Sequence, residues 1–183
     1  DRPHRPDQLV FDLDPSGDDF EPVRRAAWQV GDALRDAGLT PFVKTTGSRG
    51  LHVVAPLKPG ADFDRVRRAC RRLADHLVAR HPDALTAEQR KNKRHGRLYL
   101  DIMRNAFGQT AVAPYAVRAK PGAPVATPLD WNEVNDADIG PPRYRVDNLF
   151  RRLGQKDDPW ADMAHHAADI GTLETALRAW ERD

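Results

Sequence analysis

The sequence LVFDLD at residues 9–14 runs directly into the turn-forming sequence PSG. Its first half is apolar, and apolar and acidic residues alternate at its end, which is typical of a buried strand followed by a turn. Successive strand residues point to opposite faces, so Asp12 and Asp14 share one face. We therefore predict a strand that carries two acidic side chains side by side near its end.

The neighbouring segments alternate between helical spacing and short apolar runs. Apolar residues that recur every three or four positions indicate amphipathic helices, and short apolar runs bounded by glycine or proline indicate strands. After the first strand we predict, in chain order, a helix over residues 20–37, strands over 41–45 and 51–55, a helix over 63–77 and a strand over 97–103. Asp18 or Asp19 can cap the first helix, and Asp62 can cap the second.

The order β-α-β-β-α-β is the split βαβ arrangement of RRM-like and ferredoxin-like domains, an α+β fold with two helices on one face of the sheet. Later segments are predicted as a strand over 110–117 interrupted by Pro114, a proline-rich connection over 121–142 and a closing helix over 160–180 with a kink at Gly171. We expect residues 1–120 to form the core and residues 121–183 to pack on it as a connection and helical extension of the same domain.

Composition narrows the class of protein. The chain has 183 residues, 40% of them hydrophobic and 31% charged, which suits one globular domain. It contains no apolar run of the about 20 residues needed to cross a membrane, and its first residues do not form a secretory signal. A single cysteine, Cys70, excludes an internal disulfide and argues against a cysteine-based zinc site. We interpret the protein as cytoplasmic without a membrane partner, and the missing initiating Met as the sign of a fragment or processed product.

The net charge of +2 conceals a strongly basic segment. Residues 90–120 contain eight Lys and Arg residues against one acid, Asp101, whereas residues 121–183 contain twelve acids and seven bases. A basic run is often only a solvated face. Here it surrounds a single carboxylate, which favours a phosphate-binding surface.

Asp101 ends its predicted strand in the same apolar-then-acidic manner as Asp12 and Asp14. The first and fourth strands are neighbours in a split βαβ sheet, so Asp101 can join the other two carboxylates. Like charges repel unless a cation lies between them, and Mg²⁺ or Mn²⁺ commonly bridges carboxylates and substrate phosphates. The three residues are thus candidate ligands for two ions that would activate a 3′-oxygen and stabilise a leaving pyrophosphate. Acids exposed beside a turn are the simpler alternative.

The loop KTTGSRGLH at residues 44–52 combines glycines, hydroxyls, a cation and a histidine. Glycines allow a close backbone approach to a phosphate, and N–H groups and hydroxyls can donate to it. A hairpin turn would look similar, and the spacing of a Walker P-loop is absent. His52 enters the third strand, beside the first, and so lies in reach of the carboxylates, although a strand histidine is more often structural.

Four motifs together resemble one known family. They are FDLDP at residues 11–15, the loop at 44–53, Asp101 and TAVAPYAVR at residues 110–118. Their order and spacing are similar to those of the polymerase domain of bacterial ligase D, which belongs to the archaeo-eukaryotic primase superfamily, and the resemblance runs from about residue 5 to near residue 180. It implies a primase-type palm and a nucleotidyltransferase that adds nucleotides, typically ribonucleotides, from triphosphates to DNA 3′ ends in non-homologous end joining.

The resemblance also implies roles for individual residues. The catalytic residues, which bind two Mn²⁺ or Mg²⁺ ions, would be Asp12, Asp14 and Asp101. The residues that hold the incoming nucleoside triphosphate would be Thr46, Ser48, Arg49, Gly50 and His52, with Arg94, Arg118 and Lys120 as phosphate ligands. The implied partners are primer-template, gapped or broken DNA, a ligase domain or chain, and an end-binding protein, at a nucleoid-associated location.

Departures from the family pattern leave two alternatives open. Thr46 stands where relatives usually have Ser, and Arg49 where Lys is common. The family's domain also has an N-terminal part that recognises the 5′-phosphate of DNA, and we expect this chain to lack it. Such a chain could bind DNA ends without extending them, which is the main alternative. A haloacid-dehalogenase-type phosphatase, whose opening strand also ends in D-x-D, is the remote one, because that family has Thr or Val where this chain has Ser16.

Overall fold

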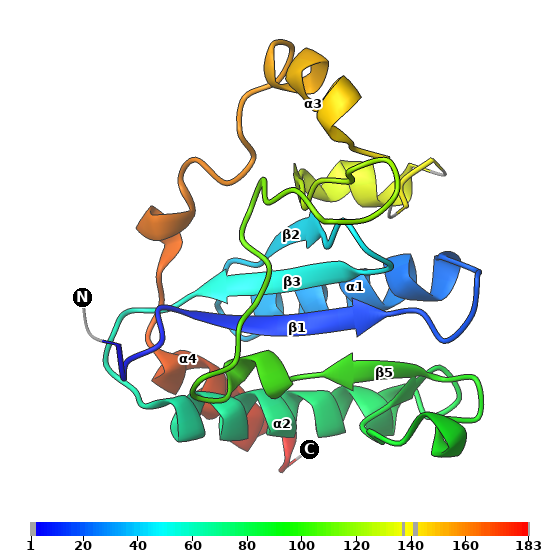
Figure 1. Cartoon of the computed structure of the whole chain (residues 1–183). Helices are drawn as coiled ribbons and strands as arrows, with labels where there is room; N and C mark the ends of the chain where they lie inside the picture. Colours follow the sequence, from blue (N-terminus) through cyan, green and yellow to red (C-terminus); the bar gives the residue numbers. More distant parts are fainter. Residues whose placement is uncertain (1–2, 137, 141–142, 183) are drawn as a thin grey trace.

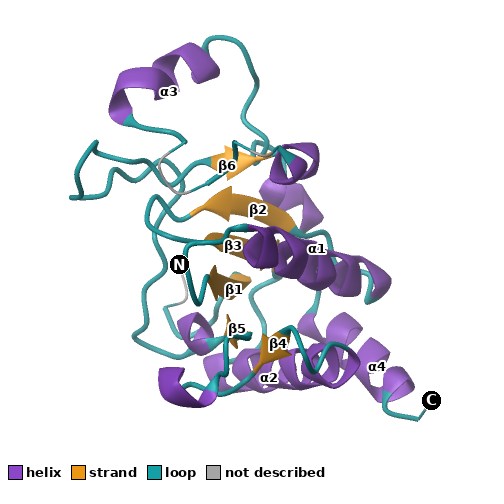
Figure 2. Cartoon of the chain, turned by 90° about the vertical axis from the view of Figure 1, so that its right-hand side faces the viewer, coloured by secondary structure: helices purple, strands orange, loops and turns teal. Residues whose placement is uncertain are grey.

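The computed structural model describes residues 3–136, 138–140 and 143–182. Within these residues the protein forms one six-stranded sheet in the order β4-β5-β1-β3-β2-β6 (Figure 1 for its four central strands, Figure 2 for all six). The strands are β1 (Gln8–Asp14), β2 (Phe42–Thr45), β3 (Leu51–Pro56), β4 (Leu85–Thr86), β5 (Leu98–Asp101) and β6 (Pro128–Leu129). The α-helices are α1 (Glu21–Asp36), α2 (Phe63–Arg80), α3 (Val146–Leu153) and α4 (Ile170–Trp180). None of the described helices is long and apolar enough to span a bilayer.

The pairing of the strands confirms the predicted split βαβ fold. β1 pairs antiparallel with β3 and with β5, so the first and fourth of the predicted strands are neighbours. β2 pairs antiparallel with β3. Two short strands that were not predicted complete the edges: β4 runs parallel to β5, and β6 runs antiparallel to β2.

Alternation along the strands separates a packed face from an open face. Leu9, Phe11 and Leu13 of β1 lie in the main core with residues of α1 and α2, whereas Val10 packs with Trp160 on the other face. Figure 2 shows α1 and α2 on one side of the strands and irregular chain on the other. Because residues two apart share a face, the acidic residues of β1 lie on this second side, which we call the open face.

The two long helices form where predicted, with one difference in capping. Asp62 caps α2, since its Oδ1 accepts from the N–H of Arg65 at 2.7 Å. At α1 the N-cap position is Phe20, which makes no side-chain cap. Asp19 accepts instead from the N–H of Glu21 at 2.9 Å, so the predicted acidic residue supports the helix start from one position further out.

Residues 110–117, predicted as a strand, do not form one. Pro114 has no N–H for a ladder, and Tyr115 adopts a left-handed φ of 62°. Backbone bonds join the end of the segment to residues 124–126, including an isolated bridge between Val117 and Val125. The predicted strand over residues 97–103 likewise ends early, at Asp101, and a 3-10 turn follows it. In Figure 1 the segment after this turn crosses in front of β1 and β3 as irregular chain.

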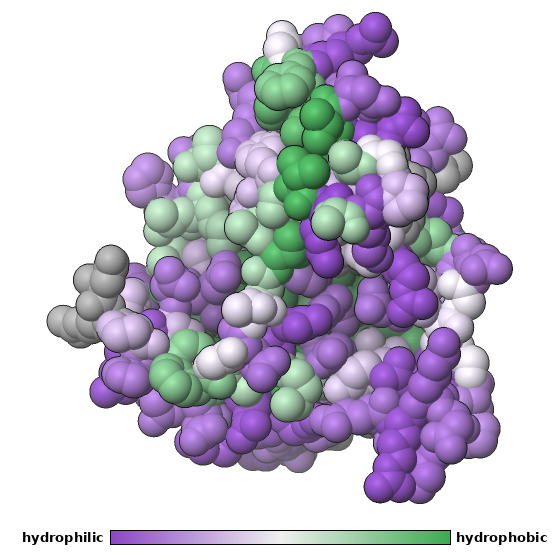
Figure 3. All heavy atoms as spheres, in the orientation of Figure 1, coloured by the Kyte–Doolittle hydropathy of each residue, from purple (hydrophilic) through white to green (hydrophobic). Residues whose placement is uncertain are grey.

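The predicted helix over residues 160–180 is wrong in its first half. Asp169 accepts from the N–H of Gly171 at 2.7 Å and so starts α4 at Ile170. Gly171 therefore lies in the first turn of α4 and produces no kink. The short helix α3 was not predicted at all. It exposes apolar side chains, with Phe150 at 74% exposed, and Figure 3 shows hydrophobic surface gathered over this part of the molecule.

Candidate active site

Four polar side chains form a row across four adjacent strands on the open face. Asp12 of β1 is the register partner of Asp101 on β5 and of His52 on β3, and Lys44 of β2 is the partner of His52. Directly opposed residues of antiparallel strands point to the same face. The row, which we call the polar row, therefore runs Asp101, Asp12, His52, Lys44. Its last three members are buried, at 6%, 3% and 2% exposed.

Asp12 is bound by two side chains. His52 Nε2 lies 3.3 Å from Asp12 Oδ1, and Arg104 Nε donates to Asp12 Oδ2 at 3.1 Å. Burial, the largest influence, would raise the pKa of Asp12, but the hydrogen bonds and charges of His52 and Arg104 outweigh it and lower the pKa. Burial lowers the pKa of His52 despite its bond to Asp12. Asp12 is thus an ionised carboxylate beside an uncharged imidazole at neutral pH.

Asp12, Asp14 and Asp101 line one cavity of about 220 Å³, which we call the acidic cavity. Burial raises the pKa of Asp14, and the neighbouring charge of Asp12 raises it further. Asp101 Oδ1 accepts from the N–H of Met103 at 2.8 Å. Across the described residues, no three or more His, Cys, Asp or Glu side chains are placed to hold a metal ion. The three carboxylates therefore border a common cavity without converging in this conformation.

The donors of the acidic cavity suit a hard divalent cation. Carboxylate oxygens are the ligands that Mg²⁺ and Mn²⁺ prefer. Burial and the adjacent charge of Asp12 both disfavour the ionised form of Asp14, and a bound cation would oppose both effects. Metal binding by Asp12, Asp14 and Asp101 remains a prediction.

Thr46 holds the glycine-containing loop in shape. Its Oγ1 donates to Gly50 O at 3.1 Å and accepts from the N–H groups of Ser48 and Gly50, both at 3.2 Å. Gly47 adopts a left-handed φ of 59° in the same turn. Thr46 is buried, whereas Arg49 is exposed. The buried hydroxyl therefore organises the turn that carries Ser48 and Arg49.

Gly50 is required by its contact with β1. A Cβ at this position would lie 2.0 Å from Leu13 O and 2.8 Å from Asp14 Oδ1. We expect Gly50→Ala to lower the free energy of unfolding by about 2–3 kcal/mol, since the backbone of the loop or of β1 must shift. Gly17→Ala is the control, because a Cβ there meets nothing within 4 Å. Equal urea unfolding curves for the two variants would show that the contact has no energetic weight.

A second cavity, of about 450 Å³, lies beside the acidic cavity and is called the loop cavity. Its polar lining residues are Asp12, Asp14, Thr46, Ser48, His52, Arg104, Thr110 and Arg118. Arg118 NH1 donates to Thr46 O at 2.9 Å, and Lys120 Nζ donates to Ser48 Oγ at 2.5 Å. Two predicted cations are thus brought to the predicted loop across 72 residues of sequence.

Arg49 and Arg94 line the acidic cavity instead. Arg49 NH2 lies 4.0 Å from Asp14 Oδ2. Arg94 donates to the carbonyls of residues 88 and 89 at 3.0 and 2.6 Å, and its Cζ lies 4.3 Å from the ring centroid of Tyr99. Six of the predicted binding residues are therefore divided between two cavities that share Asp12 and Asp14. Gly50 and Lys120 line neither cavity, although Lys120 bonds Ser48.

Lys44 and Arg104 belong to the site but were not singled out from the sequence. Lys44 Nζ is buried and has no hydrogen-bond partner among the described residues. Burial lowers the pKa of Lys44 to about 7. Strand alternation would have placed Lys44 beside His52 across the hairpin, and this was the available signal. Arg104 follows the last strand residue by three positions, and no motif marks it.

Known proteins provide an independent comparison. A family model described as LigD, primase-polymerase domain, matches residues 1–160. The chain is 36% identical over 165 residues to the multifunctional non-homologous end joining protein LigD of Pseudomonas aeruginosa, covering 87% of this chain and 19% of that protein. It is 32% identical over 167 residues to the bifunctional non-homologous end joining protein LigD of Bacillus subtilis, covering 90% of this chain and 27% of that protein.

Among solved structures, the polymerase domain from Mycobacterium tuberculosis ligase D in complex with DNA matches with a TM-score of 0.81 and 30% identity, covering 89% of this chain and 56% of that chain. The chain thus spans under a third of the two LigD proteins and little more than half of the solved domain. These matches give the haloacid-dehalogenase-type phosphatase hypothesis no support. Because the family model covers most of the chain and the fold agrees, the chain belongs to the LigD primase-polymerase domain family.

Proposed function

We propose that the chain is the catalytic part of a metal-dependent nucleotidyltransferase that adds nucleotides, preferentially ribonucleotides, to DNA 3′ ends in non-homologous end joining. One observation carries the proposal. Asp12 and Asp14 lie between two cavities, one bordered by the third carboxylate, Asp101, and the other by hydroxyls and arginine side chains. Membership of the family supports it, because the relatives are named as end joining proteins.

The carboxylates would hold two divalent ions, Mn²⁺ or Mg²⁺, whose chemistry is to activate the attacking 3′-oxygen and stabilise the leaving pyrophosphate. His52 orients the carboxylate of Asp12 through its contact at 3.3 Å. The buried residues Leu9, Phe11 and Leu13 hold the backbone of β1, and with it the two acidic residues, against the core.

The loop cavity would take the triphosphate. Ser48, Arg118 and Lys120 are joined to one another through the loop and offer one hydroxyl and two cations. Hydrogen bonds from cations to phosphate oxygens are the strong, charge-assisted kind. Arg94, fixed by two backbone carbonyls, offers a further cation at the acidic cavity.

The basic segment would bind the DNA backbone. Arg90, Lys91 and Lys93 are exposed, and Lys91 also lines the acidic cavity. A cationic surface next to the carboxylates is suited to a phosphodiester chain that ends at the site. The solved domain with the same fold is itself in complex with DNA, which supports DNA as the partner. A ligase domain or chain and an end-binding protein are further proposed partners.

The proposed preference for ribonucleotides involves Thr46 indirectly. Its hydroxyl is already engaged with Gly50 and Ser48 inside the loop. We therefore expect Thr46 to influence the choice of sugar by fixing the positions of Ser48 and Gly50 beside the loop cavity.

Primer extension tests the proposal and separates it from the main alternative. With Mn²⁺ and all eight nucleotides, the wild-type chain should extend a 5′-tailed duplex, faster with ribonucleotides. Binding of the same DNA, measured by fluorescence anisotropy, should weaken steeply with salt because counterions are released. Salt-sensitive binding with no extension would favour a DNA-end-binding role without catalysis. Absence of both would contradict the proposal.

A further inference from the structure

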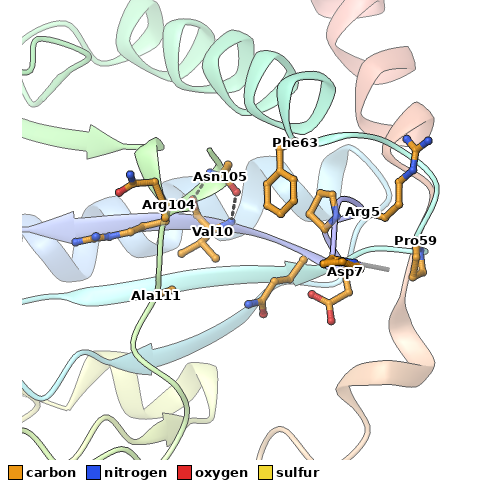
Figure 4. Close-up of a pocket in the computed structure, with 12 residues that line it drawn as sticks. Arg5, Asp7, Val10, Pro59, Phe63, Arg104, Asn105 and Ala111 are labelled. Atoms are coloured by element: carbon orange, nitrogen blue, oxygen red, sulfur yellow. Dashed lines mark hydrogen bonds between the residues drawn. The ribbon is translucent and has the colours of Figure 1, made fainter. Parts of the chain in front are cut away.

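Arg104 joins the polar row from outside the predicted motifs. It lies in the 3-10 turn Met103–Asn105 that follows β5, and its Nε donates to Asp12 Oδ2 at 3.1 Å. Its NH1 donates to Thr110 O at 3.3 Å. Figure 4 shows the side chain extending along β1, away from Phe63. One guanidinium therefore links the central carboxylate to the segment that crosses the open face.

The backbone of this turn is anchored more firmly than the Arg104 side chain. Asn105 is 3% exposed, and its Oδ1 accepts from Val10 N at 2.8 Å while its Nδ2 donates to Val10 O at 2.7 Å (Figure 4). The Arg104 side chain, in contrast, is 38% exposed. It borders the loop cavity and also a larger cavity of about 790 Å³. The guanidinium thus has room to leave Asp12 while the turn stays in place.

Arg104 places a permanent positive charge beside the carboxylate of Asp12. The Asp12 side chain is 8% exposed, and a buried carboxylate is costly unless it is paired. Arginine remains protonated at every working pH, so its charge is always present. A divalent cation bound by the same carboxylate would repel the adjacent guanidinium. The two cations therefore compete for one carboxylate.

We propose that Arg104 is a positioning residue that neutralises Asp12 in the metal-free protein and must withdraw from it when a divalent ion binds. Arg104 thereby sets the affinity for the metal, because an ion bound by Asp12 must first displace this charge-assisted hydrogen bond. The inference rests on the proposed function in one respect, the assignment of Asp12 as a metal ligand.

Direct Mn²⁺ binding tests the inference without any catalytic readout. Electron paramagnetic resonance of free Mn²⁺ gives the dissociation constant for the wild-type chain, Arg104→Gln, Arg104→Lys and Asp12→Asn. Arg104→Gln should bind Mn²⁺ about tenfold more tightly than wild type, since the displaced bond is worth at least one factor of ten. Arg104→Lys keeps the charge but not the planar donor, so its affinity for Mn²⁺ should lie between those of the wild type and Arg104→Gln. Arg67→Gln, which removes a similar ion pair with Asp64 at 3.3 Å on α2, is the control and should match wild type.

Thermal unfolding supplies a second readout. Without metal, Arg104→Gln should melt below the wild type because Asp12 has lost its counter-charge, and saturating Mn²⁺ should raise its melting temperature by more than it raises that of wild type. Mn²⁺ affinities of Arg104→Gln and Arg104→Lys equal to or weaker than wild type, with Asp12→Asn clearly weakened, would overturn the role of Arg104 alone. An Asp12→Asn variant that binds Mn²⁺ as wild type does would overturn the metal site itself, and the inference with it.

Discussion

Asp12→Asn is expected to lower the rate of nucleotide addition by at least about a thousandfold, equivalent to about 4 kcal/mol of barrier. Asn keeps the shape of the side chain but loses the charge that a metal ligand needs. Asp12 and Asp14 both border the two cavities, but only Asp12 is paired in register with Asp101 and His52, so we expect Asp14 not to replace it. Single-turnover extension of a primed DNA end with Mn²⁺ and ribonucleotides measures the effect.

The matched control is Asp32→Asn on α1. Asp32 makes an ion pair with Arg35 at 2.7 Å and its side chain is 62% exposed, far from the open face in the fold. The same chemical change there should leave the extension rate unchanged. Circular dichroism must show both variants folded. Extension by Asp12→Asn at more than a tenth of the wild-type rate would remove Asp12 from the catalytic centre.

Lys44→Met is expected to stabilise the protein at neutral pH by about 4 kcal/mol, as an order of magnitude. Lys44 is 2% exposed, its Nζ has no partner among the described residues, and burial lowers its pKa to about 7. An unfolded lysine titrates near about 10.4. Holding the buried ammonium in the folded state therefore costs free energy, and methionine removes this cost with little change in shape.

The stability gained in Lys44→Met should decrease as the pH rises. Between pH 7 and about 10 the unfolded chain binds a proton at Lys44 that the folded chain has released, so raising the pH stabilises the wild type. The advantage of Lys44→Met should therefore be largest at and below pH 7 and shrink by up to about 1.4 kcal/mol per pH unit above it. Urea unfolding from pH 6.5 to 10 measures it, with the exposed Lys58→Met as control. A difference that does not change with pH would show that Lys44 is uncharged or solvated throughout.

Apart from the two-residue strand β4, the helices and strands of the first hundred residues could be predicted because their signals are local. The alternation in β1 and the helical spacing in α1 and α2 each arise within one element, and the split βαβ order then places Asp101 beside Asp12. The same reasoning identified the loop around Thr46, although not the bonds by which its hydroxyl closes the turn.

The features of the site that could not be predicted depend on contacts between segments distant in the sequence. Lys44 lies on an inner strand because β2 pairs with β6, a two-residue strand with no periodic pattern of its own. Arg104 reaches Asp12 from a turn that Asn105 ties to Val10 across 95 residues of sequence. Such contacts produce no pattern in the local sequence. A lysine within a strand, such as Lys44, is therefore predicted as exposed unless its neighbours in the sheet are known.

The alternation of β1 has a consequence for how this chain can vary in length. Leu9, Phe11 and Leu13 fill the core while Asp12 and Asp14 occupy the open face. Inserting or deleting one residue within this strand would exchange the two sets, burying carboxylates in apolar surroundings and exposing leucines to water. β1 should therefore tolerate no insertion or deletion, and engineered length changes are best confined to the turn that follows it.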